Sequence, residues 1–378
     1  MKFVIAIDSF KGSLSSKVAG QIVARAVKDV CTDAEVKVFP FADGGEGTVE
    51  AITSACGGSY REVTVKNPIG KEIKAVYGII PETNTAVVEA ASAAGLTLID
   101  ADERNPLVTT TYGFGEMIRD AIENGCRRFI VGIGGSATND GGVGMLQALG
   151  FGFYDENGKD VPFGANGLKV LKSIKTENAL NELDKCEFLV ACDVKNPLYG
   201  ETGCSRIFAR QKGGTDETIP LMDEWMKKYA ETTKTVANGA DPFASGAGAA
   251  GGLGFAFMNY LNGKLQPGVE LVIDETRLEK AIKDADCVIT GEGRLDGQTI
   301  MGKAPYGIAR VAKKYGVPVI ALCGCVGKGA ERCNDLIDAF FPIIRKPCSE
   351  EEAMEENNAK NNLYATATQA IKLLKLKR

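Results

Sequence analysis

The sequence of 378 residues contains no histidine. This absence excludes Ser-His-Asp and Cys-His catalysis, histidine-ligated zinc, and an imidazole general base. Acid–base chemistry must therefore fall to Asp, Glu, Lys, Tyr or Cys side chains. A metal ion, where the protein uses one, is expected to be a hard cation held by oxygen ligands.

Cysteine patterns that signal disulfides or zinc sites are also missing. The 11 cysteines are odd in number and scattered, and no two have Cys-x-x-Cys spacing. The nearest pair is Cys323 and Cys325, and most others lie in apolar runs, among them Cys126, Cys192 and Cys287. This pattern is typical of buried, reduced thiols in a cytoplasmic protein.

Long hydrophobic runs and an excess of positive charge are absent as well. No apolar run approaches the roughly 18 residues that a membrane-spanning helix needs, and the segment Met1–Asp8 is too short for a signal peptide. The 44 basic and 49 acidic side chains leave a formal charge of −5. We therefore expect a cytoplasmic protein, monomeric or homodimeric, whose partner is a small molecule rather than a nucleic acid or a membrane.

Short apolar strands alternate with helical stretches at both ends of the chain, which is typical of a parallel sheet with right-handed crossovers. Near the N-terminus, the expected strands are 3–7 and 35–39 and the helices are 15–30 and 48–55. Towards the C-terminus, the expected strands are 269–273, 287–290 and 317–323, and the helices are 275–283, 303–315 and 350–376.

The middle of the chain has a different pattern. Strands expected at 63–65, 75–80 and 86–89 are separated by turn sequences, which predicts antiparallel hairpins. We therefore expect an α/β fold of two lobes around a cleft. A discontinuous Rossmann-like lobe with a parallel sheet takes residues 1–66 and 280–378, and a second α/β lobe with a mixed sheet takes 67–279.

Four of the strand-like runs end in polar loops, most of them rich in glycine and acids. The loops lie at 42–48, 134–142, 193–197 and 291–297. Because ligands of open α/β sheets bind at the carboxyl ends of strands, we expect these loops to line the cleft. Glycine backbone approaches phosphates closely and carboxylates hold Mg²⁺, so the pattern predicts handling of a phosphate–metal complex.

The loop at 291–297 places an arginine between two acids. If the loop is extended, alternation puts Glu292, Arg294 and Asp296 on the same side. Arg294 then holds a carboxylate or phosphate, and Asp296 acts as a base or a metal ligand. An ordinary surface ion pair is the alternative interpretation.

Lys303 lies in a near match to a P-loop at 297–304. Ala304 stands where a P-loop carries the Ser or Thr that binds Mg²⁺, so we reject a Walker-type nucleotide site. Lys303 begins a predicted helix, whose N-terminus already favours anions, and remains a candidate for phosphate binding.

The loop at 134–142 combines four glycines with hydroxyl and amide side chains. Gly134 and Gly135 offer backbone N–H groups, Ser136 and Asn139 offer side-chain donors, and Asp140 is a candidate metal ligand. The loop lacks the third glycine of a dinucleotide fingerprint, which argues against an NAD site. A simple tight turn is the alternative.

The first expected strand runs into Asp8-Ser-Phe-Lys-Gly-Ser13. Lys11 is a candidate for neutralising a phosphate, and Ser9 for donating a hydrogen bond to it. Asp8 and Ser13 serve equally well as helix caps.

Three further acids are candidates because of where they stand. Asp43 and Glu46 lie in the loop at 42–48, and Asp193 directly follows an apolar run. Each is a candidate for binding a metal ion or a substrate hydroxyl.

Taken together and in order, these motifs resemble the bacterial type I glycerate kinases over nearly the whole chain. The matching segments include Asp8-Ser-Phe-Lys-Gly-Ser-Leu14, Gln211-Lys-Gly213, the glycine-rich segment 248–254 and Gly291-Glu-Gly-Arg-Leu-Asp-Gly297. Two departures stand out. Phe208-Ala-Arg210 replaces the usual Phe-Gly-Pro before Gln211, and Ile7 replaces a proline before Asp8.

The resemblance implies ATP- and Mg²⁺-dependent phosphorylation of D-glycerate. The similar members mostly give 2-phosphoglycerate, and the 3-hydroxyl is the alternative position. We expect Asp296 or Asp193 to accept or orient the hydroxyl proton, and Mg²⁺ to bind near the carboxylates of Asp43, Glu46 or Asp140. The substrate carboxylate and γ-phosphate would be held by Lys11, Arg294 and Lys303.

Two other functions are compatible with glycine loops on α/β lobes. A nucleotide-linked oxidoreductase predicts NAD(P)H binding, which the missing fingerprint disfavours. A sugar-acid-binding regulator predicts ligand binding without Mg²⁺, which leaves the repeated acid–glycine loops unexplained.

Overall fold

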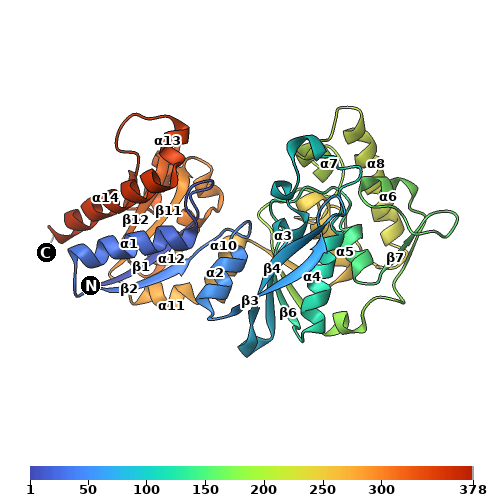
Figure 1. Ribbon diagram of the computed structural model, residues 1–378, viewed down its shortest axis with the longest axis horizontal. Coiled ribbons are helices and arrows are strands. Elements are labelled where there is room, and N and C mark those ends of the chain that lie inside the picture. The colour runs from blue at the N-terminus through green and yellow to red at the C-terminus, as the bar shows by residue number, and fades with distance from the viewer. Residues whose placement is uncertain (377–378) are drawn as a thin grey trace. The chain divides into compact units, whose positions relative to one another are not determined.

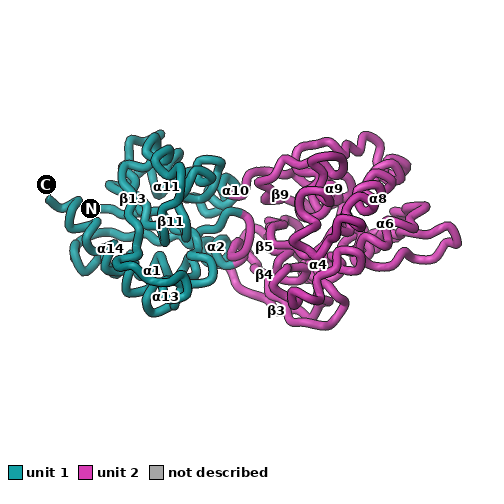
Figure 2. Tube along the Cα trace, turned by 90° about the horizontal axis from the view of Figure 1, so that it is seen from above, with its two compact units in different colours: residues 1–43, 50–57, 269–378 teal, residues 44–49, 58–268 magenta. Residues whose placement is uncertain are grey.

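The structure is a computed structural model that describes residues 1–376, and its chain divides into two units (Figure 2). Unit 1 contains residues 1–43, 50–57 and the chain from Val269 onward, and unit 2 contains residues 44–49 and 58–268. The sequence places the boundaries later, at 66/67 and 279/280. The strand Ser59–Lys66 belongs to unit 2 because it is hydrogen-bonded into that unit's sheet.

Unit 1 is built on a parallel sheet of five strands, in the order β13-β12-β11-β1-β2. The strands are β1 (Lys2–Ile7), β2 (Glu35–Pro40), β11 (Cys287–Leu295), β12 (Val319–Val326) and β13 (Ala339–Pro342). Phe3 of β1 pairs with Cys287 of β11 on one side and with Val36 of β2 on the other. The pairing of β1 with β11 therefore brings the N-terminal and C-terminal parts of the chain into one sheet.

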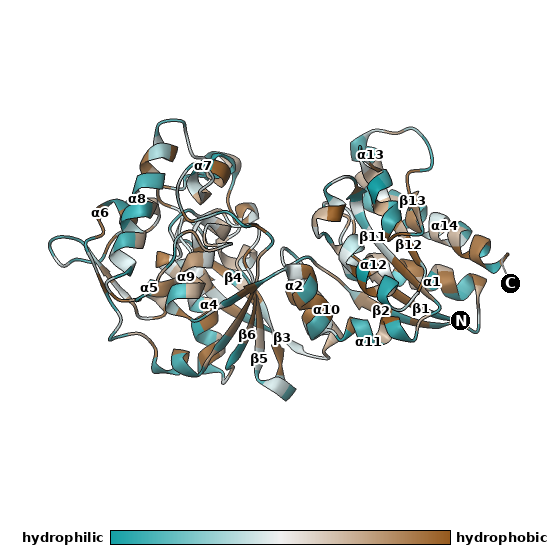
Figure 3. Cartoon of the chain, turned by 180° about the vertical axis from the view of Figure 1, so that it is seen from behind, coloured by the Kyte–Doolittle hydropathy of each residue, from teal (hydrophilic) through white to brown (hydrophobic). Residues whose placement is uncertain are grey.

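Helices cover both faces of this sheet (Figure 1). On one face lie α1 (Ser16–Val30) and α14 (Glu356–Lys375), whose apolar side chains share a core with Phe3, Ile5 and Ile289. On the other lies α12 (Ala304–Lys314), with α10 (Gly268–Glu275), α11 (Leu278–Lys283) and α2 (Thr48–Ala55) among the remaining helices of the unit. Figure 3 shows the sheet strands coloured as apolar beneath helices of mixed character, as expected for a doubly covered parallel sheet.

Unit 2 contains a mixed sheet of six strands, in the order β10-β9-β6-β5-β4-β3. The strands are β3 (Ser59–Lys66), β4 (Glu72–Ile80), β5 (Thr85–Glu89), β6 (Arg128–Gly132), β9 (Glu187–Ala191) and β10 (Lys264–Gln266). β3, β4 and β5 pair antiparallel, whereas β5, β6, β9 and β10 run parallel. A separate two-stranded sheet pairs β7 (Gly152–Tyr154) with β8 (Ser173–Lys175).

The helices of unit 2 surround one large apolar core. They are α3 (Ala91–Ala94), α4 (Tyr112–Glu123), α5 (Val143–Ala148), α6 (Ala165–Val170), α7 (Cys204–Phe208), α8 (Thr218–Thr233) and α9 (Leu253–Tyr260). Phe129 of β6 stacks on Phe188 of β9 with ring centroids 4.7 Å apart, and Phe257 of α9 packs against Phe188. The predicted fold class, a parallel-sheet α/β lobe and a mixed-sheet lobe, is confirmed.

Three predicted elements are wrong in detail. The run 269–273 is helical, because Val269, Val272 and Ile273 are buried at helical spacing while Glu270 and Asp274 face solvent. Strand β11 continues to Leu295 rather than ending at residue 290. The predicted terminal helix is broken into α13 (Glu350–Met354) and α14, and the Glu355 side chain caps the start of α14.

Two negative findings hold for residues 1–376. None of their helices is long and apolar enough to cross a membrane. All 11 cysteines are free, and none of them forms a disulfide.

Candidate active site

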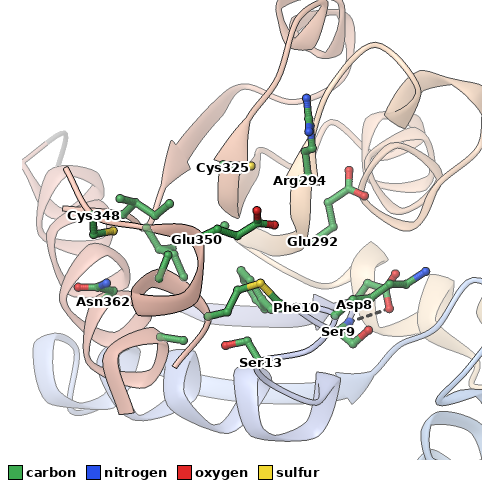
Figure 4. Close-up of a pocket in the computed structure, with 18 of the residues that line it drawn as sticks. Asp8, Ser9, Phe10, Ser13, Glu292, Arg294, Cys325, Cys348, Glu350 and Asn362 are labelled. Atoms are coloured by element: carbon green, nitrogen blue, oxygen red, sulfur yellow. Dashed lines mark hydrogen bonds between the residues drawn. The ribbon is translucent and has the colours of Figure 1, made fainter. Parts of the chain in front are cut away.

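Unit 1 contains a cavity of about 630 Å³ at the carboxyl ends of its central strands (Figure 4). β2 lies on one side of β1, and β11, β12 and β13 run outward on the other side. The strand order therefore reverses between β1 and β11, which is where open parallel sheets bind their ligands. The residues that follow β1 and those at the end of β11 line the cavity.

Carboxylates crowd one end of this cavity. Asp8 follows β1 directly and is only 8% exposed, and Asp43 and Glu292 also line the space. Burial, and next the charge of Asp43, raises the pKa of Asp8 to about 7, against the hydrogen bond that its carboxylate accepts from the Ser9 backbone N–H at 2.7 Å. These acids therefore repel one another at neutral pH, which favours binding of a cation between them.

A network of contacts orders the acids at the end of β11. The Thr299 hydroxyl donates to Glu292 Oε1 at 2.6 Å, and burial raises the pKa of Glu292. Lys303 Nζ lies 3.7 Å from Glu292 and 3.9 Å from Asp296, whose other oxygen lies 3.4 Å from Arg294 Nε. Arg294 lines the cavity, as the sequence predicts for a residue of the site. Its side chain is also mostly exposed and pairs with Asp296, which is the alternative of an ordinary surface ion pair.

The other end of the cavity is largely apolar. Ile343, Ile344, Ala353 and Met354 line it, beside the carboxylate of Glu350. In Figure 4, Asp8 and Glu292 lie at one end and Cys348 and Asn362 at the other. The space is therefore amphipathic and within the size range of small-molecule sites.

Most of the predicted residues of unit 1 meet at this cavity. Its lining includes Ser9, Lys11, Asp43, Glu292, Arg294 and Lys303. Asp296 is not part of the lining but contacts Lys303 and Arg294, which are. Sequence reasoning treated Asp8 as a helix cap, although its position directly after a buried strand was the same signal that selected Asp193.

Unit 2 brings the glycine loops 44–48 and 134–142 side by side. A Cβ atom on Gly132 would lie 2.9 Å from the Gly44 carbonyl oxygen, and one on Gly134 would lie 3.1 Å from the Gly45 Cα atom. Glycine is needed at these positions because the two backbones touch. The remaining predicted residues belong to this unit: Glu46, Gly134, Gly135, Ser136, Asn139, Asp140 and Asp193.

Asp140 organises the second loop from within. It is 1% exposed, and its carboxylate accepts hydrogen bonds from the Thr111 N–H and hydroxyl and from the N–H groups of Gly142 and Gly144, at 2.8 to 3.3 Å. Four donors occupy the oxygens that a metal ion would need. The geometry therefore favours a structural role for Asp140 over the metal binding that the sequence predicts.

Three other predicted residues of unit 2 also make structural contacts. Asn139 is fully buried and its amide donates to Ser205 Oγ at 2.9 Å. Asp193 Oδ1 accepts from the Gly268 N–H at 3.0 Å, joining the end of β9 to the end of β10. Ser136 Oγ accepts from Lys212 Nζ at 3.0 Å, and Lys212 is a residue that sequence reasoning quoted in a motif but did not assign to the site.

Glu89 at the end of β5 is a second residue that sequence reasoning missed. Its carboxylate is 6% exposed and accepts a hydrogen bond from the Val49 N–H at 2.5 Å. Burial raises the pKa of Glu89 to about 7, against the backbone hydrogen bonds, and the nearby charge of Glu46 adds to the rise. The signal in the sequence was again an acid at the end of an apolar strand.

The raised pKa of Glu89 predicts how stability depends on pH. The folded protein holds this proton up to about pH 7, whereas the unfolded chain releases it near pH 4.5. Stability from this group is therefore complete below pH 4.5 and is lost as the pH rises through 7, by on the order of 3 kcal/mol at most. Glu89→Gln should flatten this part of the curve of unfolding free energy of unit 2 against pH, measured by urea denaturation between pH 4.5 and 8 with the fluorescence of Trp225 in α8 of that unit.

The comparison uses slopes rather than absolute stabilities. The amide of Glu89→Gln faces backbone donors, so a constant offset is expected at every pH. Glu82→Gln, an exposed change in the turn before β5, is the matched control and should keep the wild-type slope. Equal slopes in all three proteins would show that Glu89 titrates normally.

No preformed metal centre is found among residues 1–376: no three acidic or cysteine side chains are arranged to hold an ion. Mg²⁺ commonly binds through one or two carboxylates, with water and substrate phosphates completing its coordination. The carboxylates of Asp8, Asp43 and Glu292 suit such partial coordination by hard oxygen atoms.

The sequence is similar to known proteins over nearly its whole length. The model of the glycerate kinase family matches residues 3–375. A protein named glycerate kinase from Halalkalibacterium halodurans is 43% identical over 357 residues, covering 94% of each chain. A protein named glycerate 2-kinase from Escherichia coli is 43% identical over 375 residues, covering 98% of each chain.

The fold is matched as closely as the sequence. A crystal structure described as a putative glycerate kinase 2 from Salmonella typhimurium superposes with a TM-score of 0.90 at 40% sequence identity. The match covers 100% of this chain and 99% of the other. The similarity therefore includes both units.

Proposed function

Because the chain belongs to the glycerate kinase family, we propose that it transfers the γ-phosphoryl group of ATP to the 2-hydroxyl of D-glycerate, giving 2-phosphoglycerate and ADP. The observation that carries the proposal is the family match, which spans residues 3–375 without loss of either unit. The relative from E. coli, named a glycerate 2-kinase, supports the 2-hydroxyl. Transfer to the 3-hydroxyl, giving 3-phosphoglycerate, is the alternative.

The charges of the unit 1 cavity support phosphoryl transfer with a metal ion. Its lining holds four carboxylates (Asp8, Asp43, Glu292 and Glu350) and three cations (Lys11, Arg294 and Lys303). The chain thus supplies no net positive charge there for a polyphosphate. A bound Mg²⁺ supplies that charge and neutralises phosphate oxygens.

Residues of this cavity have distinct proposed roles. Lys11 and Lys303 bind anionic oxygens of the substrates, and exposed Arg294 adds a bidentate donor. Asp43 and Asp8 would hold the metal ion, which would neutralise phosphate charge. Asp296 accepts the proton of the glycerate hydroxyl as its oxygen forms the new bond to phosphorus, while the bond from phosphorus to ADP breaks.

The proposal is tested by supplying the purified protein with D-glycerate, ATP and Mg²⁺. The product is coupled through enolase and pyruvate kinase, with and without phosphoglycerate mutase. A signal without mutase shows that the 2-hydroxyl is phosphorylated, and a signal only with mutase shows that the 3-hydroxyl is. No signal with active coupling enzymes rejects D-glycerate as the substrate.

The metal requirement needs a separate measurement, because it must not pass through the coupling enzymes. ADP formation is followed by chromatography in the presence of Mg²⁺ or of excess EDTA. We expect ADP only when both Mg²⁺ and D-glycerate are present. Equal rates in EDTA would contradict the proposed role of the carboxylates.

A further inference from the structure

Lys212 is a buried cation beneath the glycine loop of unit 2. It lies in the short 3₁₀ turn η5 (Arg210–Lys212) and is 2% exposed. Its Nζ atom donates to Ser136 Oγ at 3.0 Å and to the Thr138 carbonyl oxygen at 2.6 Å. Both acceptors belong to the loop at 134–142, so the lysine is fixed against that loop.

The backbone conformation next to Lys212 is restricted. Gly213, the next residue, has φ of 93°, a left-handed conformation that favours glycine. A Cβ atom there would also clash with the Arg104 carbonyl oxygen. The backbone at Gly213 therefore requires glycine, and the position of the Lys212 ammonium group is fixed by its two hydrogen bonds.

Among residues 1–376 no carboxylate forms an ion pair with Lys212, although the charge of the buried Asp140 acts on it from beyond ion-pair distance. Burial lowers the pKa of Lys212 to about 8, so the side chain is still mostly protonated at neutral pH. A buried charge without a direct ion-pair partner is unfavourable in a folded protein. A bound ligand of negative charge would stabilise the buried ammonium group of Lys212.

The loop above Lys212 has groups suited to an anion. Gly134 and Gly135 are exposed, whereas Ser136 is 4% exposed. Lys212 donates to a lone pair of Ser136 Oγ, which leaves the hydroxyl proton of Ser136 to donate to a ligand. The Thr138 hydroxyl of the same loop is buried and has no hydrogen-bond partner within the described chain.

We propose that Lys212 is the positioning cation of an oxyanion site formed at Gly134, Gly135 and Ser136, acting on the bound anion through Ser136. The inference rests on the proposed function, because the anion is a phosphate of the nucleotide or the carboxylate of glycerate. These two sources share one chemistry, a small oxyanion that accepts hydrogen bonds from the glycine turn and the Ser136 hydroxyl.

The test compares ligand-induced stabilisation of the full chain in two variants and a control. Lys212→Met removes the charge but keeps the aliphatic length, and Ser136→Ala removes only the hydroxyl. Lys227→Met is the matched control, since Lys227 is an exposed lysine of α8 in the same unit. Melting temperatures are measured with increasing ADP and, separately, with increasing D-glycerate.

We expect Lys212→Met to weaken the binding of one of the two ligands by about 30-fold or more. Ser136→Ala should weaken the binding of the same ligand by about 5- to 10-fold. Loss of ADP binding identifies a phosphate, and loss of glycerate binding identifies a carboxylate. If Lys212 has a purely structural role, the variants should weaken the binding of both ligands together or of neither.

The proposal is overturned if Ser136→Ala, or a folded Lys212→Met protein, binds both ligands as the wild type does. Ser136→Ala decides the matter should Lys212→Met fail to fold. Failure of the proposed function looks different: the wild-type protein would then give no 2- or 3-phosphoglycerate in the coupled assay, whatever the variants do with ADP.

Discussion

Asp296→Asn is expected to lower kcat of the proposed glycerate kinase reaction by about 10²- to 10⁴-fold, with KM for D-glycerate and ATP changed less than about threefold. The amide keeps the shape of the side chain and still accepts from the Gln298 N–H, which bonds Asp296 Oδ1 at 2.9 Å. It cannot accept the hydroxyl proton in the transition state. Initial rates over a range of both substrates give the two parameters.

Two further variants define the result. Asp193→Asn tests the other acid that the sequence proposed as base; because Asp193 belongs to unit 2 and is not part of the lining of the unit 1 cavity, we expect a smaller loss of turnover. Asp33→Asn is the control, since Asp33 is exposed and lies in a turn of unit 1 before β2. Near-native kcat for Asp296→Asn would remove Asp296 from the chemical step, and a larger loss for Asp193→Asn would exchange the two roles.

Asp140→Ala is expected to destabilise unit 2 by about 3–5 kcal/mol. Truncation leaves the N–H groups of Thr111, Gly142 and Gly144 buried without their acceptor. The loss concerns one unit, so a single two-state analysis of the whole chain is unsuitable. Trp225, the only tryptophan, lies in α8 of unit 2, and its fluorescence during urea denaturation reports the unfolding of that unit.

The same variant separates the two interpretations of Asp140. A metal ligand would leave the urea midpoint of unit 2 near that of the wild type and raise the Mg²⁺ concentration needed for activity. Asp184→Ala, an exposed acid of the same unit, should change the midpoint little. A wild-type midpoint for Asp140→Ala would therefore restore the prediction made from sequence.

Regular elements with a clear period were predictable from the sequence. Helix α2 has the predicted bounds, 48–55, and α1 begins one residue later than expected because Ser15 is its N-cap, accepting from the Val18 N–H at 3.3 Å. The run 269–273 was misread because a short apolar segment fits a strand and a helix equally well. The structure shows a helix here, with Glu270 and Asp274 exposed to solvent and the apolar side chains buried.

The candidate site was predictable where a polar residue lies near or just beyond the carboxyl end of a strand. Lys11, Asp43 and Glu292 meet at the cavity because β1, β2 and β11 end at the same edge of one sheet. That reasoning did not distinguish acids that face a cavity from those, such as Asp140, that satisfy buried backbone donors. The hydrogen-bond partners of a carboxylate depend on three-dimensional packing, which a local motif does not contain.

Lys212 was missed for a related reason. A lysine in a short motif is expected to be exposed, because buried lysines are rare. Only the packing of η5 against the loop at 134–142 reveals that its ammonium group is enclosed. The left-handed Gly213 beside it was the one local feature that marked the turn as unusual.

The pairing of β1 with β11 has a consequence for synthesis of the chain. Phe3 is synthesised long before its partner Cys287, which follows only after all of unit 2 has been made. Unit 2 can thus complete its sheet while β1 and β2 still lack the strand on their open side. Until β11 is made, the apolar strand Lys2–Ile7 presents an unpaired edge, which is the kind of edge through which nascent chains aggregate.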